Sequence, residues 1–134
     1  MNKFVSFEGI GYVAVTVPVS SAAKTYLEAN YTNAKTGNVD INGKNLAVML
    51  NEDGTVGFGT GALFGIIKTY EMDGFAGVQI KGGIDKVPTS EAITGGIKTL
   101  KVTAAGALDA DDSGKEVSVV KPSSADSLYA SIIL

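Results

Sequence analysis

The residues Lys98-Thr99-Leu100-Lys101-Val102-Thr103 are the clearest indication of the fold class, because Leu100 and Val102 alternate in them with polar side chains. A period of two places the polar residues on one face of a β-strand and the apolar residues on the other. The stretch Glu116-Val117-Ser118-Val119 repeats this alternation. Both segments therefore predict β-strands that have one face in water and one face in a core.

Turn signals separate these segments from their neighbours. Six dipeptides join a glycine to asparagine, aspartate, serine or another glycine: Asn42-Gly43, Asp53-Gly54, Asp73-Gly74, Gly82-Gly83, Gly95-Gly96 and Ser113-Gly114. Type I′ and II′ hairpin turns need a positive φ, which glycine adopts readily and residues with a bulky Cβ do not. The chain therefore reads as short strands joined by tight turns.

Seven candidate strands lie between the turn signals, at residues 12–19, 46–50, 63–70, 75–81, 97–103, 117–121 and 128–134. Residues 63–67 are apolar throughout except for Gly65, which is typical of a central strand buried on both faces. Short strands and frequent turns favour an antiparallel arrangement. We expect an all-β fold, a small antiparallel β-barrel or sandwich of about seven short strands.

One segment departs from the strand pattern. Apolar residues recur at helical spacing after Ser20-Ser21, which predicts one short helix over residues 21–29. Such a short helix is unstable alone, so Tyr26 and Leu27 are expected to dock on the sheet. Residues 17–22 and 120–125 share a brief pattern, but one match of this length does not establish a repeat. We expect a single β-domain over residues 12–134, preceded by an N-terminal arm over residues 1–11.

The composition excludes many kinds of chemistry. The chain has 134 residues and a formal net charge of −3, and it contains no cysteine, histidine, tryptophan or arginine. Thiolate nucleophiles, Ser-His-Asp triads and the usual zinc, haem and iron–sulfur ligands are therefore absent. The negative charge opposes binding to nucleic acid, and no apolar run reaches the roughly 18 residues of a membrane span. We expect no cofactor, no metal, no nucleic-acid partner and no membrane partner.

Three motifs resemble functional sites. Residues 57–62 have the glycine spacing of a dinucleotide fingerprint, but a strand is expected after them where that fingerprint needs a helix. Residues 109–116 begin like a calcium loop, yet Val120 occupies the position where an EF-hand needs glutamate. Glu71 and Asp73 are a carboxylate pair of the kind that glycoside hydrolases use, although Asp73-Gly74 is also a good turn. We favour a turn in all three cases.

The second half of the chain resembles the small capsid cement, or decoration, proteins of tailed bacteriophages. The resemblance covers residues 60–134 and rests on strand and turn motifs: Leu63-Phe64-Gly65-Ile66-Ile67, Val78-Gln79-Ile80-Lys81-Gly82-Gly83, Ile93-Thr94-Gly95-Gly96, Ala105-Gly106-Ala107-Leu108 and the final Ile132-Ile133-Leu134. The first 59 residues match that family less well, because the predicted helix and the polar loop after it are longer than the family's opening. No catalytic signature is part of the resemblance.

The resemblance implies a non-enzymatic virion structural protein, made in the host cytoplasm, that decorates the outside of the capsid. It further implies the major capsid protein as partner and a homotrimer as the assembly. The residues expected to contact the capsid or a second subunit lie in the arm and in the polar loop after the helix: Phe4, Phe7, Thr32, Asn33, Lys35 and Gly37. Such contacts would be modest singly and multiplied on a regular lattice.

Two alternatives belong to other functional classes. The first is a carbohydrate-binding or cell-surface-binding β-domain, in which the acidic loop Asp109 to Asp112 holds calcium beside a sugar. The second is an enzyme that uses Glu71 and Asp73, for which Glu71→Gln would abolish a hydrolytic activity. Neither alternative has a supporting motif elsewhere in the chain.

Overall fold

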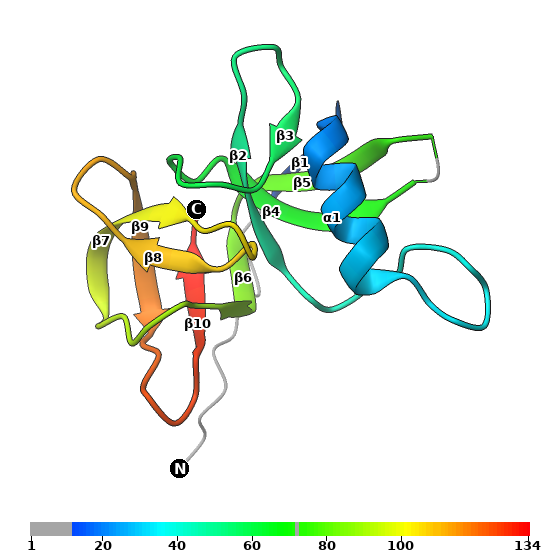
Figure 1. Ribbon diagram of the computed structural model, residues 1–134. Helices are drawn as coiled ribbons and strands as arrows, with labels where there is room; N and C mark the ends of the chain where they lie inside the picture. Colours follow the sequence, from blue (N-terminus) through cyan, green and yellow to red (C-terminus); the bar gives the residue numbers. More distant parts are fainter. Residues whose placement is uncertain (1–11, 72) are drawn as a thin grey trace.

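The computed structural model describes residues 12–71 and 73–134, and within them it is an all-β protein with one helix. The chain forms two antiparallel sheets of five strands each. The first sheet has the order β1-β5-β4-β2-β3 and the second β6-β10-β9-β7-β8. We call residues 12–81 the first lobe and residues 83–134 the second lobe. Figure 1 shows the two lobes side by side, with the helix against the first.

The elements follow in a simple order along the chain. The first lobe holds β1 (Val13–Pro18), α1 (Ser21–Tyr31), β2 (Leu46–Leu50), β3 (Val56–Gly57), β4 (Gly65–Tyr70) and β5 (Phe75–Lys81). The second lobe holds β6 (Gly83–Pro88), β7 (Gly96–Val102), β8 (Leu108–Ala110), β9 (Lys115–Lys121) and β10 (Tyr129–Ile133). Gly82, at φ 104°, lets the chain pass from β5 directly into β6.

The prediction of about seven strands was too low, because the described chain has ten. Every predicted segment overlaps a strand, and those at residues 46–50 and 75–81 have the predicted bounds. The missed strands are β3, β6 and β8. Two of them are only two and three residues long, and β6 contains Asp85, Lys86 and Pro88, which conceal its strand pattern.

Each sheet curls until its two edge strands meet. In the first lobe Val19, just after β1, bridges Val56 of β3, and the Ser20 N–H donates to the Val56 carbonyl at 2.9 Å. In the second lobe Thr89, just after β6, bridges Leu108 of β8 in the same parallel sense. The sequence left barrel and sandwich open. The structure has two small barrels, each closed by one bridge.

The helix begins where it was predicted and ends two residues later, at Tyr31. Ser20 is its N-cap, and its side chain accepts a hydrogen bond from the Ala23 N–H at 3.2 Å. Leu27 is fully buried against the first sheet, as predicted. Tyr26 is half-buried and packs on Phe58, with ring centroids 5.1 Å apart.

Two apolar clusters form the core. One lies between α1 and the first sheet, and the other fills the second barrel and includes Ala47, Leu63 and Ile66 from the first lobe. Ile66 and Ile67 of β4 belong to different clusters and are both buried. This confirms the prediction that residues 63–67 include a central strand buried on both faces. Because one cluster takes side chains from both lobes, the lobes share a core.

The two lobes repeat one topology, since each places its strands in the order first, fifth, fourth, second, third. Pro18 pairs with Phe75 in the first lobe, and Pro88 pairs with Tyr129 in the second. From these pairs, Phe75-Ala76-Gly77-Val78 corresponds to Tyr129-Ala130-Ser131-Ile132. The hairpin turns at Gly54 and Gly106 also make matching backbone hydrogen bonds.

The repeat does not follow the brief pattern noticed in the sequence. Val17-Pro18-Val19-Ser20 corresponds in space to Val87-Pro88-Thr89-Ser90, because Val17 pairs with Ala76 and Val87 pairs with Ala130. The segment at residues 120–125 lies elsewhere, at the end of β9. α1 is inserted between the first and second strands of the first lobe and has no counterpart in the second.

Candidate functional site

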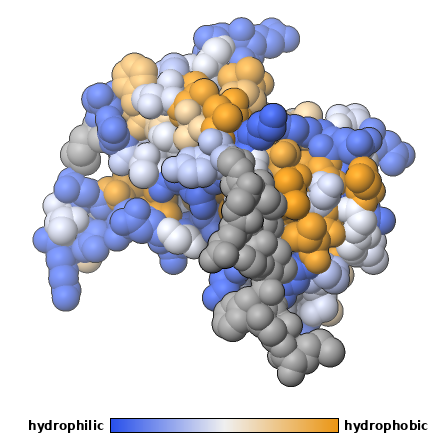
Figure 2. Space-filling model, turned by 180° about the vertical axis from the view of Figure 1, so that it is seen from behind, coloured by the Kyte–Doolittle hydropathy of each residue, from blue (hydrophilic) through white to orange (hydrophobic). Residues whose placement is uncertain are grey.

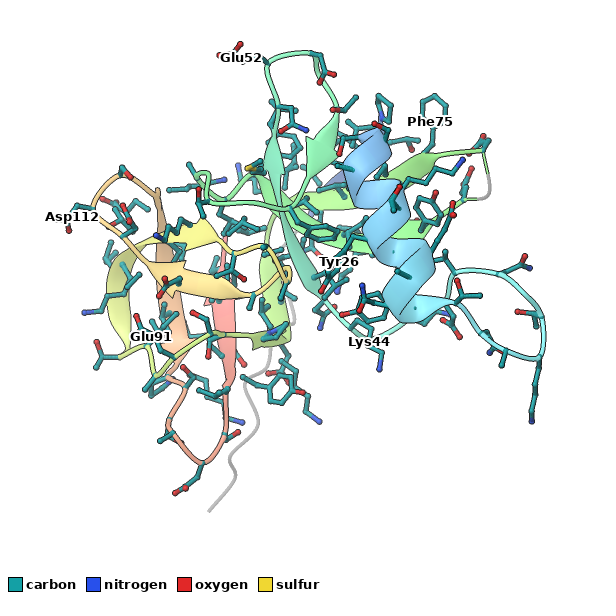
Figure 3. All side chains as sticks on the ribbon, viewed as in Figure 1. Tyr26, Lys44, Glu52, Phe75, Glu91 and Asp112 are labelled. Atoms are coloured by element: carbon teal, nitrogen blue, oxygen red, sulfur yellow. The ribbon has the colours of Figure 1, made fainter. Side chains whose placement is uncertain are left out.

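A groove of about 670 Å³ lies where the two lobes meet. Its walls come from the end of α1, the connection before β2, and strands β6, β9 and β10. The lining includes three lysines, one aspartate and two tyrosines: Lys44, Lys86, Lys121, Asp85, Tyr31 and Tyr129. In Figure 3, Lys44 lies near the C-terminal end of α1, between this helix and the second lobe. The volume is that of pockets that bind small molecules, roughly 300–1,000 Å³.

A β-bulge in β6 forms one wall of the groove. Ile84 pairs with Ile132 and Val87 pairs with Ala130, so two residues of β6 oppose Ser131 alone. Lys86, one of these two, has a φ of 55°. In the first lobe the corresponding pairing, Thr16 with Gly77, is regular. Bulges of this kind redirect side chains and are frequent beside functional sites.

Hydrogen bonds hold the bulge in place from both lobes. The Asp85 carboxylate accepts hydrogen bonds from the Ser131 hydroxyl and, at 3.0 Å, from the Lys86 N–H. Asn45, in the first lobe, donates from Nδ2 to the Asp85 carbonyl at 2.7 Å. The Asn45 side chain is fixed in turn by Lys68, whose Nζ donates to its Oδ1 at 2.8 Å.

Backbone strain is concentrated at this wall. Within the described residues, Asn45 and Lys86 are the non-glycine residues with positive φ, at 51° and 55°. Asn45 Nδ2 reaches the carbonyl of Asp85 as well as that of Lys86, so the two strained residues lie on either side of the same contact. Strained backbone of this type persists only where surrounding contacts impose it, and it is common in ligand clamps.

The electrostatics of the groove differ from those of the whole chain. Three lysines and one aspartate line it, whereas the chain as a whole is negative by three charges. Burial raises the pKa of Tyr31, and the neighbouring Tyr26 raises it further, so the Tyr31 hydroxyl stays neutral at pH 7. Burial also lowers the pKa of Lys68, which lies behind the wall. The groove therefore offers positive charge together with the neutral phenol of Tyr31.

The predicted contact residues fall into two groups. Phe4 and Phe7 lie outside the described residues. Thr32, Asn33, Lys35 and Gly37 lie in the predicted loop after α1, at the right of Figure 1. This loop is a small hydrogen-bonded hairpin, in which the Asn33 N–H donates to the Asn38 carbonyl at 2.7 Å and the Gly37 N–H to the Asn33 carbonyl at 2.8 Å. Thr32, Lys35 and Gly37 are exposed and Asn33 is half-buried.

The acidic loop Asp109 to Asp112 lies at the end of the second lobe that is far from Lys44 (Figure 3). Asp109 belongs to β8, and Asp111 begins the turn to β9. Lys101 Nζ lies 3.1 Å from an Asp111 carboxylate oxygen and 4.0 Å from one of Asp109. Across residues 12–71 and 73–134, no three acidic side chains converge in a way that could hold a metal ion.

The turn chemistry of Asp111 yields a prediction about pH. Hydrogen bonds from Ser113 and the nearby Lys101 lower the pKa of Asp111 to about 2. Because this pKa is below the ordinary 3.8, the ionised Asp111 carboxylate stabilises the folded state. The stabilisation is complete above pH 3.8 and is lost as the pH falls toward about 2. Ser113→Ala should raise the pKa of Asp111 toward 3.8, and Lys101→Gln should raise it less. Carboxyl-carbon NMR titration measures both shifts.

The control for this titration is Asp112→Asn, which removes an adjacent charge and keeps both Ser113 hydrogen bonds to Asp111. Asp111 should still titrate near 2 in that variant. An unchanged Asp111 pKa in Ser113→Ala would contradict the assigned cause.

The other two motifs lie in turns. Glu71 and Asp73 are exposed at the hairpin between β4 and β5, where the Asp73 carboxylate accepts a hydrogen bond from the Phe75 N–H at 3.2 Å. Residues 57–62 begin with the last residue of β3, Gly57, and the next element is β4. This confirms that a strand, and not a helix, comes after the glycines of the fingerprint-like motif.

An apolar patch lies on the outer face of the second sheet. Ile97, Ser118 and Ile133 are cross-strand neighbours on β7, β9 and β10, and Ile97 is 65% exposed. Val120, further along β9, is 43% exposed. Figure 2 shows apolar surface over this lobe. We call Ile97, Val120 and Ile133 the outer patch.

Sequence reasoning found neither the groove nor the outer patch. The groove residues come from segments far apart in the chain, so only the packing of the lobes brings them together. The one local signal is the charged pair Asp85-Lys86 within the run from Gly83 to Pro88. Ile97 was assigned to a strand, but nothing in the alternation shows that its face is uncovered.

The chain was compared with known proteins at the levels of family, sequence and structure. The structure has no helix among its described residues that is long and apolar enough to cross a bilayer. No protein-family model matches the chain, and searches of curated proteins and of solved structures found no match.

Proposed function

We propose that this chain is a non-enzymatic structural protein of a bacteriophage virion, which binds the outside of the capsid as a trimer and stabilises the shell. It would be made in the host cytoplasm and would take the major capsid protein as its partner. The resemblance of residues 60–134 to decoration proteins motivates the proposal. The observation that carries it in the structure is the outer patch.

The outer patch supports a binding role on energetic grounds. The buried clusters already fill the second barrel and the space between α1 and the first sheet, and exposed Ile97 and Val120 belong to neither cluster. Apolar side chains that share one face of a sheet gain free energy when a partner removes them from water, by about 25 cal/mol for each Å². A modest contact of this kind becomes strong when many copies bind a regular lattice.

The direct test mixes the purified protein with bare expanded phage shells and pellets them, after light scattering has measured its mass in solution. We expect three times the 13.7 kDa of one chain, and co-pelleting that saturates at a fixed ratio to the shell subunit. A protein that remains a monomer and stays in the supernatant would overturn the proposal.

Ile97→Lys is the variant that tests the outer patch. Because Ile97 is mostly exposed, the free energy of unfolding should change by less than about 0.5 kcal/mol, while co-pelleting should fall at least tenfold. Leu50→Lys is the matched control, since Leu50 is also apolar and is 50% exposed, but lies in the first lobe. Equal co-pelleting of both variants would show that the outer patch does not contact the shell.

A further inference from the structure

We propose that the groove between the lobes binds an oligosaccharide that carries carboxylate groups. This inference does not depend on the proposed capsid role. It begins from three observations that coincide at one place: a groove of ligand size, an excess of lysines in an acidic protein, and the described chain's two strained non-glycine residues.

The repeated topology provides an internal comparison. The first lobe has the same five-stranded arrangement, but at the positions that correspond to the groove wall it has Thr16 and Gly77, paired without a bulge. The second lobe has an extra residue there, so that Asp85 and Lys86 face Ser131. The β1–β5 pair of the first barrel also has a shift in register, but it lies between Val13 and Ala14, away from the position that corresponds to Asp85 and Lys86. The place of the bulge beside the groove is therefore particular to the second lobe.

The contacts around the bulge keep it in one arrangement. Ser131 is fully buried and bonds to the Asp85 carboxylate, while Asn45 of the first lobe donates to the Asp85 carbonyl. Lys86 is left exposed at the rim, and Lys44 and Lys121 line the same groove from the other lobe and from β9. A wall fixed in this way loses little conformational entropy when a ligand binds.

The charges of the groove indicate that the ligand is anionic. Three lysines and one carboxylate give an excess of positive charge, which attracts an anion. Lysine ammonium groups are compact point charges with several hydrogen-bond donors, and they bind carboxylates in many orientations. A ligand with several carboxylates spaced along it can meet the three lysines separately.

The tyrosines and other polar residues of the groove indicate that the ligand contains sugar rings. Tyr129 is 54% exposed beside the groove, and Tyr31 contributes a second ring. An aromatic ring gives the apolar C–H face of a pyranose a surface to pack on, and the phenol hydroxyl hydrogen-bonds with sugar hydroxyls. Ser127 and Asp85 add polar groups to the same lining. This combination fits an acidic sugar better than an acidic peptide, which has no ring faces of this kind.

The probe is trigalacturonic acid, and its binding to the full chain is measured by isothermal titration calorimetry. The salt concentration is kept at about 50 mM, because higher salt screens exposed charges. We expect one saturable site. Maltotriose, which has the same ring count and no carboxylates, should bind at least about tenfold more weakly, and so should triglutamate, which has the charges and no rings.

Three variants locate the site. The pair Lys44→Gln with Lys121→Gln should weaken trigalacturonate binding by at least about tenfold, and Tyr129→Ala by a few fold. Lys86→Gly should also weaken it, because glycine adopts the positive φ of the bulge without the charge. The matched control is Lys24→Gln with Lys35→Gln, two exposed lysines outside the groove lining, which should change affinity less than about twofold.

Amide chemical shifts of the unaltered protein give a second readout that does not depend on a variant folding. Trigalacturonate should shift residues 43–46, 84–88 and 129–131. The proposal is overturned if trigalacturonate does not bind, if triglutamate binds equally well, if the shifts map elsewhere, or if the groove and control variants lose affinity alike.

Discussion

Gly114→Ala should cost more than about 3 kcal/mol of the free energy of unfolding, and the variant should accumulate as unfolded chain. An alanine Cβ at this position would meet the backbone of Leu100, with the Leu100 nitrogen at 2.7 Å and the carbonyl group closer still. Leu100 is fully buried, and its backbone pairs with Lys115. Neither strand can move away without breaking that pairing.

The control for this substitution is Gly95→Ala. Its Cβ would have the Val119 carbonyl oxygen at 3.5 Å, an ordinary contact, and no positive φ is involved, so we expect a change below about 1 kcal/mol. Urea denaturation followed by circular dichroism measures both variants. A Gly114→Ala protein with the stability of the parent would show that β7 and the β8–β9 turn do not approach each other in this way.

Leu108→Ala should lower the free energy of unfolding by about 2–5 kcal/mol, the usual cost of emptying a buried leucine site. Leu108 is fully buried, and its carbonyl accepts the Ser90 N–H at 2.9 Å where the second barrel closes. The lost side chain leaves a cavity in the cluster that both lobes share. We therefore expect the whole chain, and not only the second lobe, to become less stable.

Contacts between the lobes explain why both should lose stability in Leu108→Ala. Besides the shared cluster, the Val102 N–H donates to the Gly61 carbonyl at 2.8 Å, and the Ala47 N–H donates to the Gly106 carbonyl at 2.7 Å. NMR signals of Leu27 in the first lobe and Ile132 in the second should lose intensity at one common urea concentration, which falls in Leu108→Ala.

Leu50→Ala is the matched control for Leu108→Ala, because it removes the same atoms from a side chain that is 50% exposed. It should cost less than about 1 kcal/mol. If only the Ile132 signal moved to lower urea in Leu108→Ala, the lobes would unfold independently and the shared cluster would contribute little.

The turn signals show how local chemistry predicts local structure. In five of the six predicted dipeptides a glycine has positive φ: Gly43, Gly54, Gly74, Gly82 and Gly96. Ser113-Gly114 is the exception. Gly114 does not have positive φ and is needed because a side chain would strike Leu100. That requirement comes from a strand distant in sequence, so the dipeptide could not reveal it.

The missed strand β6 shows where periodicity fails. Its apolar residues Ile84 and Val87 face the core, but the bulge between them breaks the period of two. The repeated topology of the two lobes could not be recognised in the sequence either, because the spacing of corresponding strands differs. α1 and its loop lengthen the first lobe alone, so corresponding strands are separated by different distances along the chain.

The all-β class, the single helix with its Ser20 cap and the doubly buried strand at β4 could all be predicted from the sequence, because alternation, capping and turn formation depend on residues close in the chain. The division of the strands into two barrels of one topology became visible only in the folded chain, as did the groove that Lys44, Lys86, Lys121 and Tyr129 line. Those features depend on which strands become neighbours. Neighbours are chosen by long-range packing of the shared core, which no local pattern records.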